Sequence, residues 1–142
     1  MKKYLCLFVF MTFVLTGCEG PMGPAGEPGR GLNLETYYYT VASRDWKAVG
    51  ESGKTTFYQY IADLNLGDEI YDWGDVSVYM YLTDDGNEVQ TPLPYSIPHT
   101  EGGNDWTEYY TFDFDRGTVS FYADYLRGEL PPSQEFRVVL TW

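Results

Sequence analysis

The side chains of this chain that could do chemistry are mainly carboxylates, and the densest group lies between residues 68 and 75. Asp68, Asp72 and Asp75 fall in one predicted loop, where their oxygen atoms could bind a hard cation such as calcium. A solvated acidic loop explains the same residues without any ligand. We therefore expect no metal and no other cofactor, and these three positions are only weak candidates for a metal site.

His99 is the only histidine, and a catalytic or zinc-binding role would require partners that the sequence does not supply. Paired carboxylates can hydrolyse glycosides, but acidic residues are so frequent here that such pairs are expected by chance. A domain of this length with short loops also leaves little room for a deep cleft. We therefore predict that the protein is not an enzyme.

Aromatic side chains offer a different chemistry, because the C–H face of a sugar ring packs against a flat aromatic ring. Trp73 and Trp106 stand in loop-like segments beside carboxylates and amides that could bind sugar hydroxyls, and Trp46 is a third candidate. The alternative, which we favour, is that large aromatics close the ends of the hydrophobic core. The residues predicted for a ligand site of this kind are Trp73, Trp106 and Trp46.

The N-terminal segment predicts export. Two lysines precede an apolar run over residues 5–15, which is the length of a signal-peptide core and too short for a membrane-spanning helix. Leu-Thr-Gly then precedes Cys18, and this pattern resembles the lipobox of bacterial lipoproteins. The resemblance implies a signal peptide over residues 1–17 and a lipidated Cys18, whose acyl chains would anchor the protein in a membrane.

Residues 18–31 join the lipidated cysteine to the rest of the chain. Four glycine-led triplets, several with proline, give this stretch a collagen-like character. So few triplets would not hold three chains together unaided, so we interpret the stretch as an extended tether and keep a trimer as the weaker alternative.

Residues 32–142 have the length of one domain, and their pattern predicts an all-β fold. Seven or eight strands with hairpin turns indicate an antiparallel β-sandwich, Ig-like or jelly-roll-like, with a closed barrel as the alternative. In the strand over residues 76–83 one face is apolar and the other carries Tyr79 and Tyr81. Pro92 and Pro94 place the next strand at an edge, and residues 99–105 are expected to form a polar loop.

The order of these features resembles a group of small lipoproteins of Bacteroidetes-type Gram-negative bacteria. The resemblance depends first on the lipobox and on the Gly/Pro stretch that follows it. It depends also on three short motifs farther along the chain: Asp-Trp at residues 45–46, Pro-Leu-Pro-Tyr at residues 92–95, and Phe-Arg-Val-Val at residues 136–139. It implies a β-sandwich lipoprotein anchored in the outer membrane, facing either the periplasm or the cell exterior, and it contributes no catalytic residues.

The formal net charge of −12 argues against nucleic-acid partners, since phosphate backbones would be repelled. We therefore expect a binding or structural module for a protein or a glycan. A glycan-binding module would form a patch from Trp73 and Trp106, whereas an assembly protein would expose an edge strand or an apolar face. A calcium-dependent adhesion or assembly protein is a further alternative.

Overall fold

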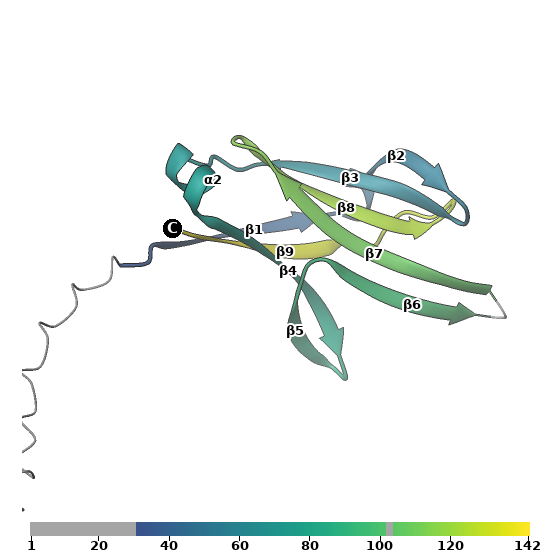
Figure 1. Cartoon of the computed structure of the whole chain (residues 1–142). Helices are drawn as coiled ribbons and strands as arrows, with labels where there is room; N and C mark the ends of the chain where they lie inside the picture. The colour runs from purple at the N-terminus through teal and green to yellow at the C-terminus, as the bar shows by residue number, and fades with distance from the viewer. Residues whose placement is uncertain (1–30, 102–103) are drawn as a thin grey trace, which may run out of the picture. The chain divides into compact units, whose positions relative to one another are not determined.

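The computed structural model of the protein describes residues 31–101 and 104–142 (Figure 1). The predicted signal peptide, Cys18 and residues 19–30 of the predicted tether lie outside the described residues. In the described part, no helix is long and apolar enough to cross a membrane.

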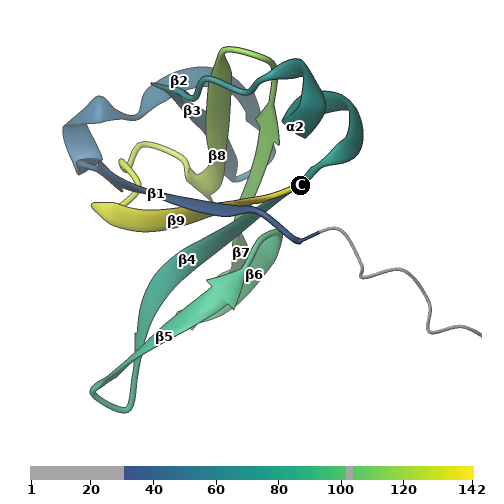
Figure 2. The same cartoon turned by 90° about the vertical axis from the view of Figure 1, so that its left-hand side faces the viewer.

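The described chain forms nine strands in two antiparallel sheets (Figures 1 and 2), which confirms the predicted all-β sandwich class. The four-stranded sheet has, in spatial order, β1 (Leu34–Val41), β9 (Gln134–Thr141), β4 (Asp75–Asp84) and β5 (Asn87–Pro92). The five-stranded sheet has β2 (Lys47–Ser52), β3 (Thr55–Asp63), β8 (Thr118–Leu126), β7 (Asn104–Phe114) and β6 (Tyr95–Glu101).

The hydrophobic core lies between the two sheets, and alternation along the strands builds it. Every second residue of the central strands is buried, including Val78 on β4, Phe121 on β8 and Val138 on β9. The rings of Phe121 and Phe136, one from each sheet, stack with their centroids 4.3 Å apart and so join the layers. The apolar face predicted for residues 76–83 is therefore the inward face of β4.

Strand β5 leaves β4 through a tight hairpin and forms one edge of the four-stranded sheet. Asp85 and Gly86 at the turn have φ values of 46° and 80°, as the Asp-Gly pair predicts for a two-residue hairpin. Pro92 ends β5, in agreement with the edge position predicted from the prolines.

The strand count was underestimated from the sequence. Residues 95–101 form the separate strand β6, whereas residues 99–105 had been expected to form a polar loop. This strand pairs with β7 at the edge of the five-stranded sheet. Its alternation is weak, since Pro98 and polar residues interrupt it, and only the pairing with β7 stabilises it as a strand.

A short helix, α2 (Asp68–Trp73), replaces part of the predicted loop before β4. Gly74 ends it where the chain passes close to β9. A Cβ atom at this position would lie 2.7 Å from the carbonyl oxygen of Ile70 and 2.8 Å from that of Thr141. Glycine is therefore required for the close approach of the helix to the sheet.

Candidate functional site

Trp46, the first of the predicted ligand-binding tryptophans, belongs to the core. Its side chain is buried, and the indole N–H donates a hydrogen bond to the carbonyl oxygen of Pro132 at 3.3 Å. Its ring lies against Tyr110 and Phe136. The Trp46 ring is therefore too buried to contact a ligand, and it closes one end of the sandwich.

Trp73 and Trp106 lie at opposite ends of the sandwich. Trp73 ends α2 and is 87% exposed. The helix contacts the far end of β7 through Tyr71, whose ring centroid is 6.1 Å from that of Phe114. Trp106 lies on the same strand, eight residues before Phe114. At the rise of an extended chain, this places Trp106 about 26 Å from Phe114. The two tryptophans therefore do not form the single patch that the glycan hypothesis predicted.

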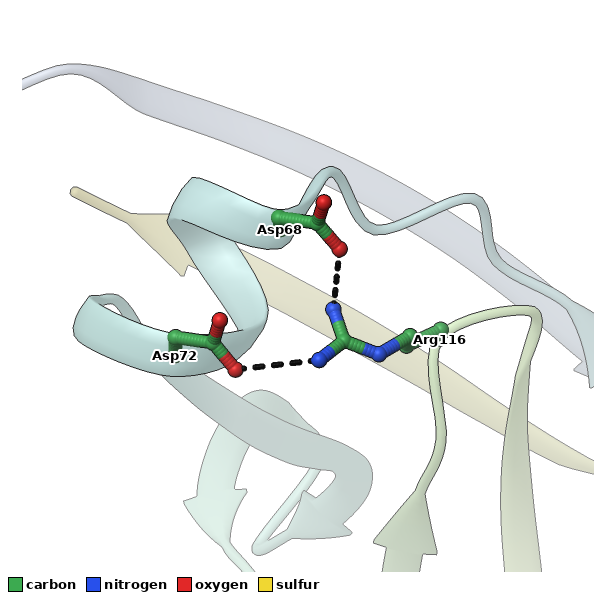
Figure 3. A network of polar contacts seen from close by, with 3 residues as sticks. All are labelled: Asp68, Asp72 and Arg116. Carbon is green, nitrogen blue, oxygen red and sulfur yellow. Dashed lines mark hydrogen bonds and ion pairs between the residues drawn. The ribbon is translucent and has the colours of Figure 1, made fainter.

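The carboxylates proposed as a metal site bind an arginine instead (Figure 3). Arg116 lies in the β7–β8 turn. Its Nη1 group donates a hydrogen bond to the carboxylate of Asp68, and its Nη2 group donates one to the carboxylate of Asp72 at 3.1 Å. Asp75 accepts a hydrogen bond from the Ser77 hydroxyl at 2.7 Å. In the described residues no group of three or more His, Cys, Asp or Glu side chains could hold a metal ion. The guanidinium thus occupies the position where a cation would bind.

His99, predicted in a polar loop, lies on β6 and contacts a buried carboxylate. Its Nε2 atom is 2.9 Å from one carboxylate oxygen of Glu108, whose side chain is only 8% exposed. The hydroxyl of Tyr110 donates to the other carboxylate oxygen. Burial, and then this hydrogen bond, raises the pKa of the Tyr110 hydroxyl.

Trp106 covers the same cluster from the surface. Its ring stacks on the imidazole of His99, with centroids 4.2 Å apart and planes inclined by 11°. Both carboxylate oxygens of Glu108 are thereby bonded within the protein. The cluster holds β6 against β7, because a buried charge is tolerated only when it is paired and hydrogen-bonded. The sequence analysis missed Glu108, although its even-numbered position among the inward residues of β7 could have indicated it.

A further aromatic surface is the outer face of the four-stranded sheet. Since the neighbouring residues on β4 and β9 are buried, the pleat directs Tyr79, Tyr81, Glu135 and Arg137 outward. We define the tyrosine face by six residues: Tyr38 and Thr40 on β1, Tyr79 and Tyr81 on β4, and Glu135 and Arg137 on β9.

Strand register brings these residues into two rows across the sheet. Arg137 pairs with Tyr38 on one side and with Tyr79 on the other, so the guanidinium-bearing residue lies between two tyrosines. Its guanidinium carbon is 4.7 Å from the centroid of the Tyr79 ring. In the next row Glu135 pairs with Thr40. The result is a flat aromatic surface with a charge of each sign.

The tyrosine face is hollowed at the end that carries Tyr81. Two adjoining depressions, of about 430 and 350 Å³, are both lined by Thr40, Tyr81, Glu88 and Glu135. Tyr38 at the rim is 68% exposed, while Tyr79 and Tyr81 are half-buried. A ring-shaped ligand could therefore lie against aromatic surface and reach carboxylate and hydroxyl groups at the same time.

The polar groups of the tyrosine face are largely unused by the protein itself. Within the described residues, the hydroxyls of Tyr38, Tyr79 and Tyr81 make no hydrogen bond. On the outer face of the other sheet, by contrast, Tyr122 donates to Asp113 at 2.8 Å and accepts from Gln59 at 3.1 Å. The tyrosine face thus keeps its donors and acceptors available to a ligand.

The outer face of the five-stranded sheet has a more apolar character. Four of its side chains are at least 39% exposed: Val49, Phe57, Ile61 and Tyr109. A depression of about 510 Å³ lies over β2 and β3 and is lined in part by Lys47, Val49 and Ile61. This face thus combines exposed apolar side chains with charged ones such as Lys47.

Comparisons of the chain with protein-family models, with curated proteins and with solved structures found no match. The geometry of the described residues is therefore the basis for a functional assignment.

Proposed function

We propose that this protein is a lipid-anchored module of the bacterial outer membrane that binds a glycan through the tyrosine face. The observation that carries the proposal is a row of outward tyrosines whose hydroxyls have no partner in the described chain, beside a hollow lined by Glu88 and Glu135. Flat aromatic surface combined with a few convergent polar groups is typical of ligand sites.

Tyrosine suits this task because its ring is apolar and its hydroxyl is polar. A sugar ring would pack its C–H face on Tyr81, and its hydroxyls would donate to the carboxylate of Glu135 and accept from tyrosine hydroxyls. The strand backbone holds each ring in place, so that little side-chain freedom is lost on binding.

The tyrosine face replaces Trp73 and Trp106 as the proposed glycan platform. The two tryptophans are too far apart for one small ligand, and the ring of Trp106 is already stacked on His99. Trp73 is exposed alone, and single exposed apolar residues are common on protein surfaces.

A protein partner is the second candidate, and a different surface supports it. The exposed side chains of Phe57, Ile61 and Tyr109 form apolar area on the outer face of the five-stranded sheet, which suits a protein contact better than a sugar. A partner of this kind would bind without the tyrosine face.

Binding measurements on the detergent-solubilised protein separate these candidates. We expect the protein to bind members of an oligosaccharide panel, and we expect Tyr81→Ala to weaken binding about tenfold, which corresponds to about 1.4 kcal/mol. The matched control is Tyr109→Ala, which removes a tyrosine that is 40% exposed on the other outer face. Circular dichroism would confirm that both variants are folded.

The outcome that contradicts the glycan proposal is specific. If no oligosaccharide binds, or if Tyr109→Ala abolishes binding while Tyr81→Ala has no effect, the tyrosine face is not the site. Co-purification of an envelope protein that is lost only in Phe57→Ala would favour the second candidate.

The anchor is a separate part of the proposal, and it depends on the sequence around Cys18. We expect Cys18→Ala to release the protein from membranes and to abolish labelling by a fatty-acid probe, because the thiol that follows the lipobox residues is removed. A Cys18→Ala protein that stays in the membrane fraction would contradict the lipid anchor.

A further inference from the structure

The charge of Arg137 is not matched by any carboxylate in the described part of the chain. The other arginines with described side chains each pair with an acid: Arg44 with Asp45, Arg116 with Asp68 and Asp72, and Arg127 with Glu51. Arg137 has no such ion pair, and its Nε atom is buried without a hydrogen-bond partner. An unmatched guanidinium is notable in a chain of net charge −12.

Packing rather than ion pairing holds the Arg137 side chain in place. Its guanidinium carbon lies 4.7 Å from the Tyr79 ring centroid, and strand register sets Tyr38 on its other side. Stacking on an aromatic ring orients the planar guanidinium without consuming its charge. The positive charge on this face therefore remains available to an anion, and arginine binds carboxylates through two parallel hydrogen bonds.

We propose that the tyrosine face selects a glycan in which one carboxylate-bearing sugar stands among neutral sugars, and that Arg137 binds this carboxylate. The inference rests on the proposed glycan-binding function and adds the class of ligand to it. Charge complementarity commits the face to this ligand, since a neutral glycan would leave the guanidinium without a partner.

Two acids on the same face of the sheet as Arg137 limit how many charges the ligand can carry. Glu135 lies two residues away on the same face of β9, and Glu88 lines both depressions. These carboxylates can accept hydrogen bonds from neutral sugar hydroxyls, but they repel further carboxylates. A glycan with an acid on every ring would also be opposed by the net charge of the whole protein. We therefore expect a preference for a single acidic sugar.

The test uses a matched pair of probes and the detergent-solubilised full chain. The first probe is a neutral xylo-oligosaccharide that carries one glucuronic acid, and the second is the same molecule after reduction of its carboxyl group to the alcohol. Titration calorimetry should give the wild-type protein at least a tenfold preference for the acidic probe. A polyuronate of similar length should bind more weakly than the singly charged probe.

Variants of Arg137 assign the preference to one residue. Arg137→Gln should abolish the preference for the acidic probe while affinity for the reduced probe is kept. Arg137→Lys should retain part of the preference, because lysine keeps the positive charge but cannot form two parallel hydrogen bonds to a carboxylate. The control is Arg44→Gln, which removes an equal charge from an exposed side chain elsewhere and should leave the preference unchanged.

Three results would overturn the inference: equal binding of both probes, an undiminished preference in Arg137→Gln, or binding of an acidic peptide with the same affinity as the acidic probe. Equal binding of both probes that is still weakened about tenfold by Tyr81→Ala would overturn only this inference and keep the glycan site. Absence of binding to both probes and to the wider oligosaccharide panel would overturn the proposed function as well.

Discussion

Tyr38 and Tyr39 are neighbours on β1, yet Tyr38 belongs to the tyrosine face and Tyr39 belongs to the interior of the sandwich. Tyr39 points into the sandwich, where its ring lies 5.6 Å from that of Phe121 and its hydroxyl donates to the carbonyl oxygen of Asp63 at 2.9 Å. Tyr38 points outward and is 68% exposed, and its hydroxyl has no partner in the described chain. The pleat of one strand thus gives the same residue type two roles.

The comparison extends to the other tyrosines of the two regions. Inside, Tyr58 and Tyr110 also have hydrogen-bond partners, because a buried hydroxyl without one costs free energy. On the tyrosine face, the hydroxyls of Tyr79 and Tyr81 are not buried, so they need no partner from the protein. Inward tyrosines therefore stabilise the fold, whereas Tyr38, Tyr79 and Tyr81 of the tyrosine face have hydroxyls that a ligand could bind.

The largest effect on stability should come from Tyr110→Phe. The substitution removes the hydroxyl that donates to the buried carboxylate of Glu108, and leaving such a group with fewer partners costs about 1–3 kcal/mol. Urea unfolding at neutral pH measures this loss. A variant as stable as the wild type would contradict the view that the interior needs this hydroxyl.

The same variant should change the alkaline pH dependence of stability. Burial raises the pKa of Tyr110 above its ordinary value of 10.0, so its contribution is fully present below that pH and is lost as the pH rises above it. The wild-type free energy of unfolding should therefore fall more steeply above pH 10 than that of Tyr110→Phe.

An intermediate effect is expected for Tyr58→Phe. The Tyr58 hydroxyl donates to the carbonyl oxygen of Glu129 at 2.6 Å, in the segment between β8 and β9. Loss of one hydrogen bond of this kind should lower the free energy of unfolding by about 0.5–1.5 kcal/mol. We expect this loss of unfolding free energy to be smaller than the loss in Tyr110→Phe, because Tyr58 donates to a neutral carbonyl and Tyr110 donates to a carboxylate. Equal losses in the two variants would show that the charge of the acceptor makes no difference.

The smallest effect on stability is expected for Tyr79→Phe. The ring that contacts Arg137 is kept, and a surface substitution of this kind changes stability by less than about 0.5 kcal/mol. Glycan affinity should nevertheless fall if the Tyr79 hydroxyl binds the ligand. A destabilisation as large as that of Tyr110→Phe would break the distinction between the two regions.

Much of the fold could be predicted because its signals are local. The alternation over residues 76–83 predicted which side of β4 faces the core, and the Asp-Gly pair at residues 85–86 is typical of the turn that follows. Strand β6 was missed because Pro98 interrupts its pattern, and its pairing with β7 is a contact between separate segments. The His99–Glu108 contact was missed for the same reason.

The sequence by itself determined the β-sandwich class, the faces of the main strands and the turn of the β4–β5 hairpin, because a period of two and a turn residue act within a few positions of the chain. The burial of Trp46 agrees with the favoured interpretation that large aromatics close the core, but only the tertiary structure decided that Trp73 and Trp106 lie far apart. It also decided that Arg137 stands between Tyr38 and Tyr79. That row exists only once β9 pairs with both β1 and β4, and no local pattern specifies a register between strands so distant in sequence.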